Sequence, residues 1–203
     1  MGRTWIPNAV TLLRIGAAPI AGGLVWWATV PEGASLGQAQ LLYLAFWIFV
    51  VASLTDWLDG YLARALSATS ALGAKLDLWA DKILVFSVLV GMLPDNWVTG
   101  TLGLVCLTGR DIYIMRLRAN RPDVSLKASL LAKTKTAIVM VGLAGILLGT
   151  AQIFEDIAQL GDVQTNASLI LMAGFLLFAI GCLLSLYTGW QYVAAARRTP
   201  RPT

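Results

Sequence analysis

Six long apolar runs constrain this chain more than any other feature of its sequence. Each run is about 20 residues long, which is the length of helix that crosses a hydrocarbon core of about 30 Å. The runs occupy approximately residues 8–30, 40–63, 74–94, 97–117, 134–154 and 167–192. Membrane β-strands are shorter, about 10 residues, and alternate in polarity, whereas helices satisfy their own backbone hydrogen bonds in lipid. The runs therefore predict an all-α integral membrane protein, built as a six-transmembrane-helix bundle.

The overall composition agrees with a membrane protein. Of the 203 residues, 58% are hydrophobic and 13% are charged, whereas soluble proteins carry about 25% charged residues. The connections between the runs are short, and no linker or internal repeat interrupts the chain. Residues 1–203 are therefore predicted to form a single domain.

Charged residues alternate between the two sides of the predicted membrane. The first, third and fifth connections contain no Lys or Arg and carry Glu32, Asp95, Glu155, Asp156 and Asp162. The basic residues gather at the other connections and at the ends of the chain, so the positive-inside rule predicts that both termini and both basic connections face the cytoplasm. We expect a bacterial inner (cytoplasmic) membrane or its equivalent. The net charge of +4 then favours anionic lipid or an anionic substrate, and no nucleic acid.

Four aspartates stand within the apolar sequence, in the stretch "TDWLDGYLARALSATSALGAKLDLWADK". Asp56 and Asp59 are spaced i, i+3, and Asp77 and Asp81 are spaced i, i+4. Both spacings stack side chains along one face of a helix. Only a short connection separates the two helices, which favours antiparallel neighbours whose acidic faces meet near the cytoplasmic surface. The four carboxylates are therefore predicted to share one pocket.

Such a pocket cannot keep four charges without compensation. At separations of about 6 Å the mutual repulsion exceeds roughly 10 kcal/mol, so the carboxylates must take up protons, bind cations or pair with Arg64, Lys75 or Lys82. The chain has no His, and carboxylates alone favour a hard divalent ion, Mg²⁺ or Mn²⁺. Four carboxylates can hold two such ions about 4 Å apart, and ions held in this way usually act on phosphates.

The spacing of these residues carries a resemblance. Asp56-x-x-Asp59-Gly60-x-x-Ala63-Arg64, followed after eight residues by Gly73-x-x-x-Asp77-x-x-x-Asp81, resembles the complete signature of the CDP-alcohol phosphotransferase family. Many relatives have Pro after the third aspartate, where this chain has Leu78, which predicts a straighter start of that helix. The resemblance implies a six-helix membrane bundle, usually a homodimer. It also implies transfer of a phosphatidyl group from CDP-diacylglycerol to an acceptor hydroxyl, with release of CMP.

The resemblance also assigns roles to individual residues. It implies that all four aspartates bind Mg²⁺ or Mn²⁺, two ions in all, and that Asp81 is in addition the catalytic general base. The residues implied to bind the CDP moiety are Asp56, Gly60, Ala63, Arg64, Gly73 and Asp77. Glycines at helix contacts often serve only close packing, and this alternative stands for Gly60 and Gly73 taken singly.

Further segments resemble one branch of the family, the bacterial phosphatidylglycerophosphate synthases. These segments are "IPNAVTLLRI", "TDWLDGYLAR", "KASLLAKTKT" and the pair Arg110-Asp111. The acceptor implied is glycerol 3-phosphate. The residues implied to hold its phosphate are Arg110, Arg118, Lys133, Lys135 and Thr136, and those implied, more weakly, to touch the lipid headgroup are Asn8, Thr11 and Arg14. Ordinary basic flanking of membrane helices is the alternative for the first set, although Arg110 lies at a depth where an unpaired guanidinium is costly.

Other assignments stay open at the level of the sequence. "IPN…RIGAAP", "SALGAKLD" and "ADKIL" also resemble cardiolipin synthases of the same family, whose acceptor is phosphatidylglycerol, and Asp111 stands where many phosphatidylglycerophosphate synthases have Glu. Phosphatidylinositol-phosphate-type and phosphatidylserine-type synthases are less favoured. An intramembrane prenyltransferase also binds Mg²⁺-diphosphate with aspartate motifs, and a cation transporter also uses buried aspartates, but the spacing and the span pattern here suit both poorly.

Overall fold

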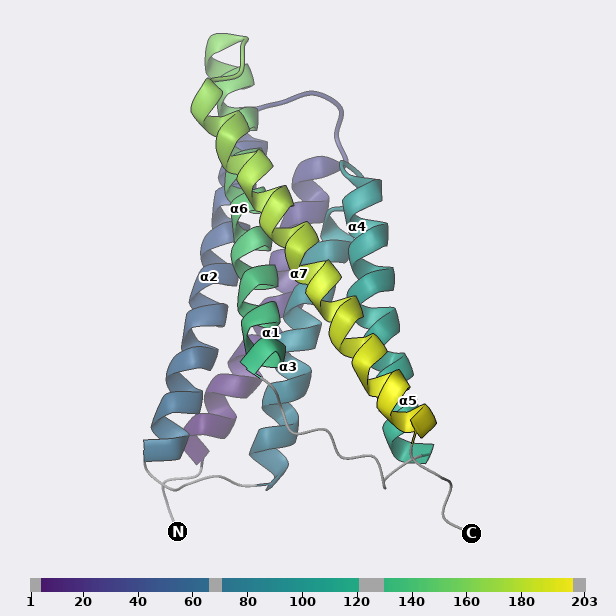
Figure 1. Cartoon of the computed structure of the whole chain (residues 1–203). Helices are drawn as coiled ribbons and strands as arrows, with labels where there is room; N and C mark the ends of the chain where they lie inside the picture. The colour runs from purple at the N-terminus through teal and green to yellow at the C-terminus, as the bar shows by residue number, and fades with distance from the viewer. Residues whose placement is uncertain (1–4, 66–70, 121–129, 199–203) are drawn as a thin grey trace.

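The structure is a computed structural model that describes residues 5–65, 71–120 and 130–198, with side chains described for 11–55, 79–117, 120 and 134–197. All the secondary structure in these ranges is helical (Figure 1). The helices are α1 (Trp5–Thr29), α2 (Leu36–Ala65), α3 (Ala71–Gly91), α4 (Trp97–Gly103), the π-helix η1 (Leu104–Gly109), α5 (Arg110–Asn120), α6 (Leu130–Leu160) and α7 (Thr165–Arg198).

The apolar runs of the sequence become long helices. Four helical stretches within the described residues are long and apolar enough to cross a membrane, namely Thr11–Thr29, Leu36–Thr55, Thr134–Leu160 and Thr165–Arg197. The fourth predicted span corresponds to α4, η1 and α5, which follow one another without a break. The prediction of an all-helical fold is thus confirmed for the described residues, and the four long apolar helices agree with a membrane protein. The count of six spans stays a prediction.

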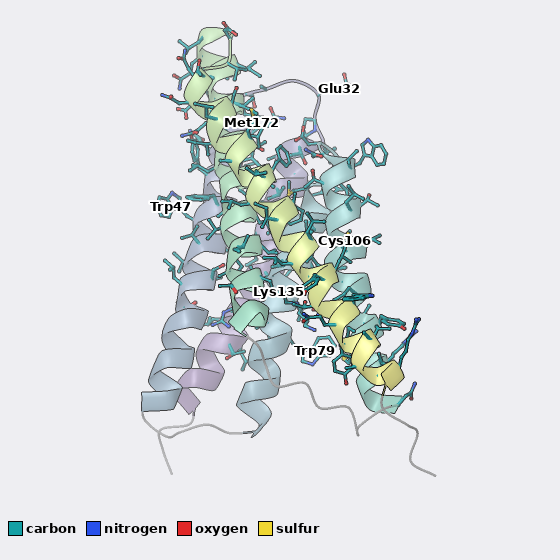
Figure 2. The ribbon with its side chains drawn as sticks, viewed as in Figure 1. Glu32, Trp47, Trp79, Cys106, Lys135 and Met172 are labelled. Carbon is teal, nitrogen blue, oxygen red and sulfur yellow. The ribbon has the colours of Figure 1, made fainter. Side chains whose placement is uncertain are left out.

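The two ends of the bundle differ in charge. Glu32, Asp95 and Asp162 lie in the three connections at one end, which we call the acidic end. At the opposite end α1 starts and α7 finishes, and the adjoining ends of α2, α3, α5 and α6 lie there too (Figure 1). This second end, which carries most of the Lys and Arg, is the basic end. Figure 2 shows Glu32 and Lys135 toward opposite ends.

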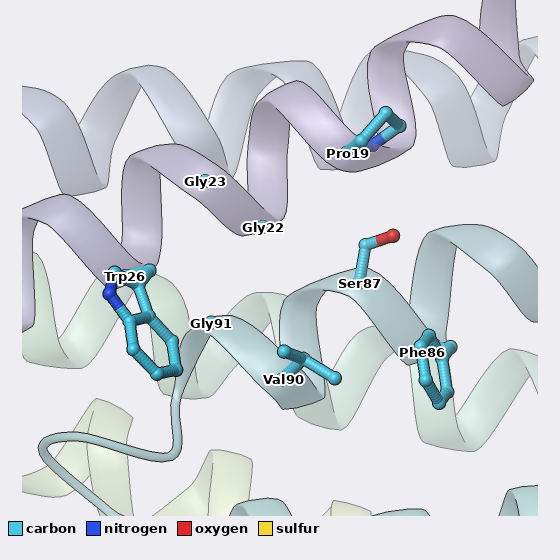
Figure 3. A pocket seen from close by; sticks show the side chains of 8 residues that line it. All are labelled: Pro19, Gly22, Gly23, Trp26, Phe86, Ser87, Val90 and Gly91. Atoms are coloured by element: carbon cyan, nitrogen blue, oxygen red, sulfur yellow. The ribbon is translucent and has the colours of Figure 1, made fainter.

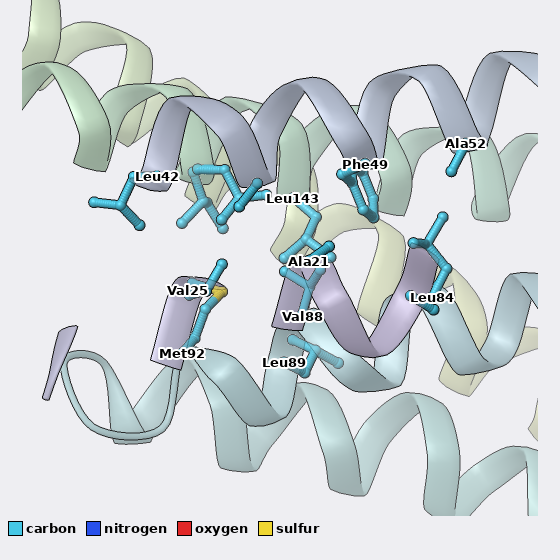
Figure 4. Close-up of a cluster of buried hydrophobic side chains, with 14 of the residues drawn as sticks. Ala21, Val25, Leu42, Phe49, Ala52, Leu84, Val88, Leu89, Met92 and Leu143 are labelled. Atoms are coloured by element: carbon cyan, nitrogen blue, oxygen red, sulfur yellow. The ribbon is translucent and has the colours of Figure 1, made fainter. Parts of the chain in front are cut away.

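The core lies where α1, α2, α3 and α6 face one another (Figure 4). Phe49 and Leu42 of α2, Leu84 of α3 and Leu143 of α6 all belong to this core, and all four side chains are buried. Since lipid tails are as apolar as these side chains, close packing rather than exclusion of water holds such a core together.

α1 occupies a place that the sequence did not predict. It packs extensively against both α2 and α3, while α2 and α3, although antiparallel, contact each other only slightly. Glycine permits this arrangement, because a Cβ atom at Gly22 of α1 would strike the carbonyl of Ser87 and one at Gly91 of α3 would strike the carbonyl of Gly22. Figure 3 shows this close approach, beside a groove of about 280 Å³. The two aspartate-bearing helices are therefore brought to one region through α1 and not by direct packing.

Candidate active site

The signature lies at the basic end of the bundle. Residues 56–64 form the last turns of α2, and residues 73–81 lie in the first half of α3 (Figure 1). α3 continues as a helix through Leu78, as expected without a proline there. The side chains of seven signature residues lie outside the described residues, namely Asp56, Asp59, Gly60, Ala63, Arg64, Gly73 and Asp77. The shared pocket of four carboxylates accordingly stays a prediction, and Asp81 is the signature side chain whose surroundings the structure describes.

Asp81 lies beside a buried arginine from another helix. The Nη1 atom of Arg14 is 3.9 Å from Oδ1 of Asp81, and the two side chains are 1% and 25% exposed. The Nε of Arg14 also donates a hydrogen bond of 3.1 Å to the carbonyl oxygen of Ala52 in α2. One guanidinium thus connects α1, α2 and α3 at the level of the signature. The structure brings Arg14 to Asp81, whereas the resemblance implied, more weakly, only a contact of Arg14 with the lipid headgroup.

Thr11 belongs to the same face of α1. It stands one helical turn before Arg14, and its side chain is buried as well. The side chain of Asn8, the third residue predicted to touch the lipid headgroup, lies outside the described residues.

A groove on the surface of the bundle leads to Arg14. It has a volume of about 430 Å³ and lies between α1 and α2. Its walls are almost entirely apolar, with Leu13, Trp47 and Val51 exposed along it, and Arg14 is the charged residue among those that line it. Such a groove suits a hydrocarbon chain that ends in an anionic group.

A second polar group connects α3, α5 and α7. Arg110 Nη1 lies 2.7 Å from Oδ1 of Asp111, and Lys82 Nζ lies 3.0 Å from Oδ2 of the same carboxylate. Arg110 Nη2 donates a hydrogen bond of 3.1 Å to Thr188 Oγ1 in α7. The 17% exposed Arg110 is therefore paired, as the cost of a lone guanidinium in a membrane requires. Lys82, considered above as a partner for the signature aspartates, pairs with Asp111.

α7 also contacts the basic start of α6. Lys135 Nζ donates to Ser185 Oγ at 3.5 Å, and Thr188 Oγ1 donates to the Ser185 carbonyl oxygen at 2.9 Å. Thr136, next to Lys135, is half-buried. The side chains of Arg118 and Lys133 lie outside the described residues. The structure thus brings Arg110 and Lys135, two of the predicted phosphate-binding residues, to the same face of α7.

Sequence reasoning missed four residues of this polar group as site residues: Lys82, Asp111, Ser185 and Thr188. Two of them carried a signal, because Lys82 directly follows Asp81 and Asp111 directly follows Arg110. Ser185 and Thr188 are spaced i, i+3 in an otherwise apolar run, which is the spacing of one helix face. Serine and threonine in a membrane helix also bond to their own backbone, so their spacing alone does not indicate a site.

The donor chemistry of the signature fits divalent cations. Among the described side chains, no three His, Cys, Asp or Glu residues gather as metal ligands, and three of the four signature carboxylates lie outside that set. The four positions on α2 and α3 supply oxygen donors alone, which Mg²⁺ and Mn²⁺ prefer over nitrogen or sulfur.

Comparisons with known proteins cover nearly the whole chain. The sequence model of the CDP-alcohol phosphatidyltransferase family matches residues 4–187. A protein of Rickettsia bellii (strain RML369-C) is 30% identical over 195 residues, covering 95% of this chain and 96% of the relative. A protein of Escherichia coli (strain K12) is 32% identical over 202 residues, covering 95% of this chain and 94% of the relative. Both relatives are named CDP-diacylglycerol–glycerol-3-phosphate 3-phosphatidyltransferase.

Proposed function

The chain belongs to the CDP-alcohol phosphatidyltransferase family, and we propose that it transfers the phosphatidyl group of CDP-diacylglycerol to glycerol 3-phosphate in phospholipid biosynthesis. The products are phosphatidylglycerophosphate and CMP. The observation that carries this assignment is the similarity, over about the whole length of both chains, to relatives named for that reaction. The geometry also supports it. Lys82 lies on α3, the helix of Asp81, and pairs with Asp111, which also pairs with Arg110. The helix of the proposed base is thereby connected to a proposed phosphate-binding residue.

The family is generally dependent on divalent metal. Asp56, Asp59, Asp77 and Asp81 would hold two Mg²⁺ or Mn²⁺ ions, which when bound supply positive charge for the pyrophosphate of the donor and for the departing CMP. The oxygen-only donor set described above suits these ions.

The reaction exchanges one P–O bond for another. The attacking hydroxyl oxygen of glycerol 3-phosphate forms a bond to the phosphorus that carries diacylglycerol. The bond from that phosphorus to the oxygen bridging to the second phosphate breaks, and its electron pair leaves with CMP. Asp81 accepts the proton of the hydroxyl. Because a carboxylate beside cations is a weak base, its contribution comes largely from its position, and Arg14 at 3.9 Å helps to set that position.

The two substrates are held from different sides. Arg110 and Lys135, with Thr136, Arg118 and Lys133, bind the phosphate of glycerol 3-phosphate, since paired cations recognise phosphate well. The residues that hold the CDP moiety are Asp56, Gly60, Ala63, Arg64, Gly73 and Asp77. An acyl chain of the donor lies in the groove between α1 and α2, with Arg14, Thr11 and Asn8 toward its headgroup.

The membrane arrangement follows from the charge pattern. The chain spans the membrane six times, with the basic end, both termini and the active site in the cytoplasm. In bacteria this places the protein in the inner membrane. Two copies form a homodimer, as is usual in the family.

CMP release by the purified protein tests the proposal. The protein receives CDP-diacylglycerol and Mg²⁺ together with glycerol 3-phosphate, phosphatidylglycerol, inositol phosphate or serine, and EDTA serves as the control for metal dependence. Release with glycerol 3-phosphate alone is the expected result. Release with phosphatidylglycerol alone would identify a cardiolipin synthase instead. No release with any acceptor from folded protein would reject phosphatidyl transfer and return attention to a prenyltransferase or a cation transporter.

A further inference from the structure

One face of α7 contacts the two basic residues Arg110 and Lys135. We call this face, made of Ser185, Thr188 and Gly189, the seat. Ser185 and Thr188 on this face are both at least nine-tenths buried, and each bonds one of the two cations. Gly189, the next residue, makes room for Arg110, because a Cβ atom there would stand 3.0 Å from Arg110 Nε and 3.2 Å from Arg110 Cγ. The hydrogen bonds of Ser185 and Thr188 and the absence of a side chain at Gly189 therefore accommodate the basic side chains on the same face of α7.

The hydroxyl of Thr188 has a fixed orientation. Its proton is donated to the Ser185 carbonyl oxygen at 2.9 Å, and a hydroxyl has only one proton to donate. Its oxygen is thereby left to accept the hydrogen bond of Arg110 Nη2 at 3.1 Å. The hydroxyl acts as a directed acceptor for the guanidinium and not as a rotor that shares its proton among partners.

The guanidinium of Arg110 is consequently held from two sides. Asp111 holds Nη1 and is itself held by Lys82 of α3, while Thr188 of α7 holds Nη2. Arginine has a long side chain with many rotamers, and the fixed fork of its nitrogens recognises phosphate best when it is already oriented. Two anchors from different helices provide that orientation before a ligand arrives.

We propose that Thr188 is a positioning residue for the acceptor site: with Ser185 and Gly189 it seats Arg110 and Lys135 so that they are oriented to bind the phosphate of glycerol 3-phosphate. This inference rests on the proposed function for the identity of the acceptor. It assigns a role to α7, whose sequence otherwise serves as a membrane span. Thr188 acts through Arg110 and does not touch the acceptor.

A purely structural role predicts a different outcome. If Thr188 only fastened α7 to α5, its loss would lower thermal stability and reduce turnover with both substrates alike. A positioning role instead raises KM for glycerol 3-phosphate selectively, with kcat and KM for CDP-diacylglycerol nearly unchanged.

The test compares Thr188→Val, which keeps the shape and removes the hydroxyl, with Thr188→Ser, which keeps the hydroxyl. We expect Thr188→Val to raise KM for glycerol 3-phosphate about tenfold, the scale of one hydrogen bond to a charged group, and Thr188→Ser to stay within about twofold of the wild type. Gly189→Ala retains the hydroxyl but crowds Arg110, and should raise the same KM. Thr188→Ala replaces the valine variant if that protein does not accumulate.

Thr150→Val is the matched control. Thr150 of α6 is half-buried, and its Oγ1, like that of Thr188, donates to a carbonyl oxygen of its own helix, that of Ile146, at 2.8 Å. The hydrogen bonds described for Thr150 include none from a cation. This variant should leave both KM values unchanged. Equal changes in both KM values for Thr188→Val, or no rescue by Thr188→Ser, would overturn the positioning role.

A second readout does not depend on turnover. Phenylglyoxal modifies free guanidinium groups, and mass spectrometry measures its rate of reaction at Arg110. Thr188→Val should raise this rate and Thr150→Val should not. If the modification rate rises only in Thr188→Val while the wild type shows no turnover, the proposed function is rejected and the role of Thr188 in orienting Arg110 is kept. If the wild type is active but Thr188→Val changes neither the modification rate nor KM for glycerol 3-phosphate, the role of Thr188 is rejected and the proposed function is kept.

Discussion

The two halves of this bundle are held together by different means. Toward the acidic end and the middle, helices approach backbone to backbone: a Cβ at Gly142 would lie 2.5 Å from the Phe178 nitrogen, and one at Gly149 would lie 2.7 Å from Leu171 Cα. Toward the basic end, side chains make the connections, through Arg14 with Asp81 and through the group that Lys82, Asp111, Arg110 and Thr188 form.

The path of α7 relates the two halves. It packs along α6 over much of its length and crosses obliquely to lie beside α5 at the basic end (Figure 1). Where backbones touch, no room remains for a ligand, and small residues suffice. Where charged side chains join the helices, the same charges can be offered to phosphates. The contrast therefore separates a half joined by close backbone packing from the half in which the proposed function places the chemistry.

The largest effect should come from Asp81→Asn, which keeps the shape of the side chain and removes the proton acceptor. We expect CMP release to fall at least about 10³-fold, since general bases contribute roughly 10²–10⁴-fold. The variant should remain folded in detergent. Retention of full activity would refute the role of Asp81 as the base.

Asp95→Asn is the matched control at the acidic end. Burial raises the pKa of the Asp95 carboxyl, so the folded protein binds that proton more tightly than the unfolded chain does. The charged form therefore opposes folding slightly at neutral pH, since Asp95 is largely exposed and solvent screens its charge, and this cost falls away as the pH drops through the raised pKa. Asp95→Asn should leave activity intact and should not lower stability at pH 7.

Gly142→Ala tests the half of the bundle in which helices approach backbone to backbone. The added methyl group collides with the α7 backbone at Phe178, and overpacking of this kind costs about 1–3 kcal/mol. We expect a clearly lower melting temperature with near-normal CMP release at low temperature. Gly23→Ala is the control, because a Cβ there meets nothing within 4 Å; equal melting temperatures for the two variants would contradict packing by close backbone approach.

Arg14→Lys should lower both stability and activity, because Arg14 bonds the backbone of α2 and also lies beside Asp81. The charge remains, but the bond from Nε to the Ala52 carbonyl oxygen is lost, which costs about 1.5 kcal/mol for a charged donor. We also expect CMP release to fall about tenfold through misplacement of Asp81. The exposed Arg116 supplies the control, and Arg116→Lys should change neither quantity; a matching loss there would remove the special role of Arg14.

Tyr43→Phe should have the smallest effect. It removes the hydrogen bond of 2.6 Å from Tyr43 Oη to Oε2 of Glu155, which joins α2 to α6, and should lower the free energy of unfolding by about 1 kcal/mol. CMP release should stay within about twofold of the wild type, as befits a polar bond remote from the basic end. A tenfold loss of activity would show that polar bonds outside the basic end also serve catalysis. Tyr113→Phe, at an exposed tyrosine, controls for the loss of a hydroxyl.

Much of the fold could be predicted from the lengths of the apolar runs. The run at 8–30 became α1 at Trp5–Thr29, and that at 134–154 became α6, which continues to Leu160. A span predicted from composition ends at the first charged residues, whereas α6 continues as a helix past Glu155, whose side chain accepts hydrogen bonds from Tyr43 and Gln159. Which helices touch could not be predicted, because an apolar helix in lipid has no polar face to fix its rotation. The place of α1 between α2 and α3 depends on backbone contacts at Gly22 and Gly91.

For the site, too, some features could be predicted from the sequence and others could not. The spacing of the aspartates placed them on two helices at one end of the bundle, and this is confirmed for the backbone. The partner of Lys82 could not be predicted, since Asp111 lies on another helix, far along the chain. Thr188 could not be predicted either, because its role depends on how α7 crosses α5.

The π-helix η1 has a consequence for mutational tolerance. It ends at Gly109, immediately before Arg110 and Asp111, and such wide turns often occur at functional sites. A π-helix holds one residue more per turn than an α-helix, so deletion of one residue within Leu104–Gly109 lets this segment close to α-helical geometry and keeps α5 near its present rotation. Insertion of one residue instead turns all of α5 by about 100° relative to α4. Arg110 would then leave Thr188, and Asp111 would leave Lys82. An insertion scan of this segment should therefore be far less permissive than a deletion scan or a substitution scan.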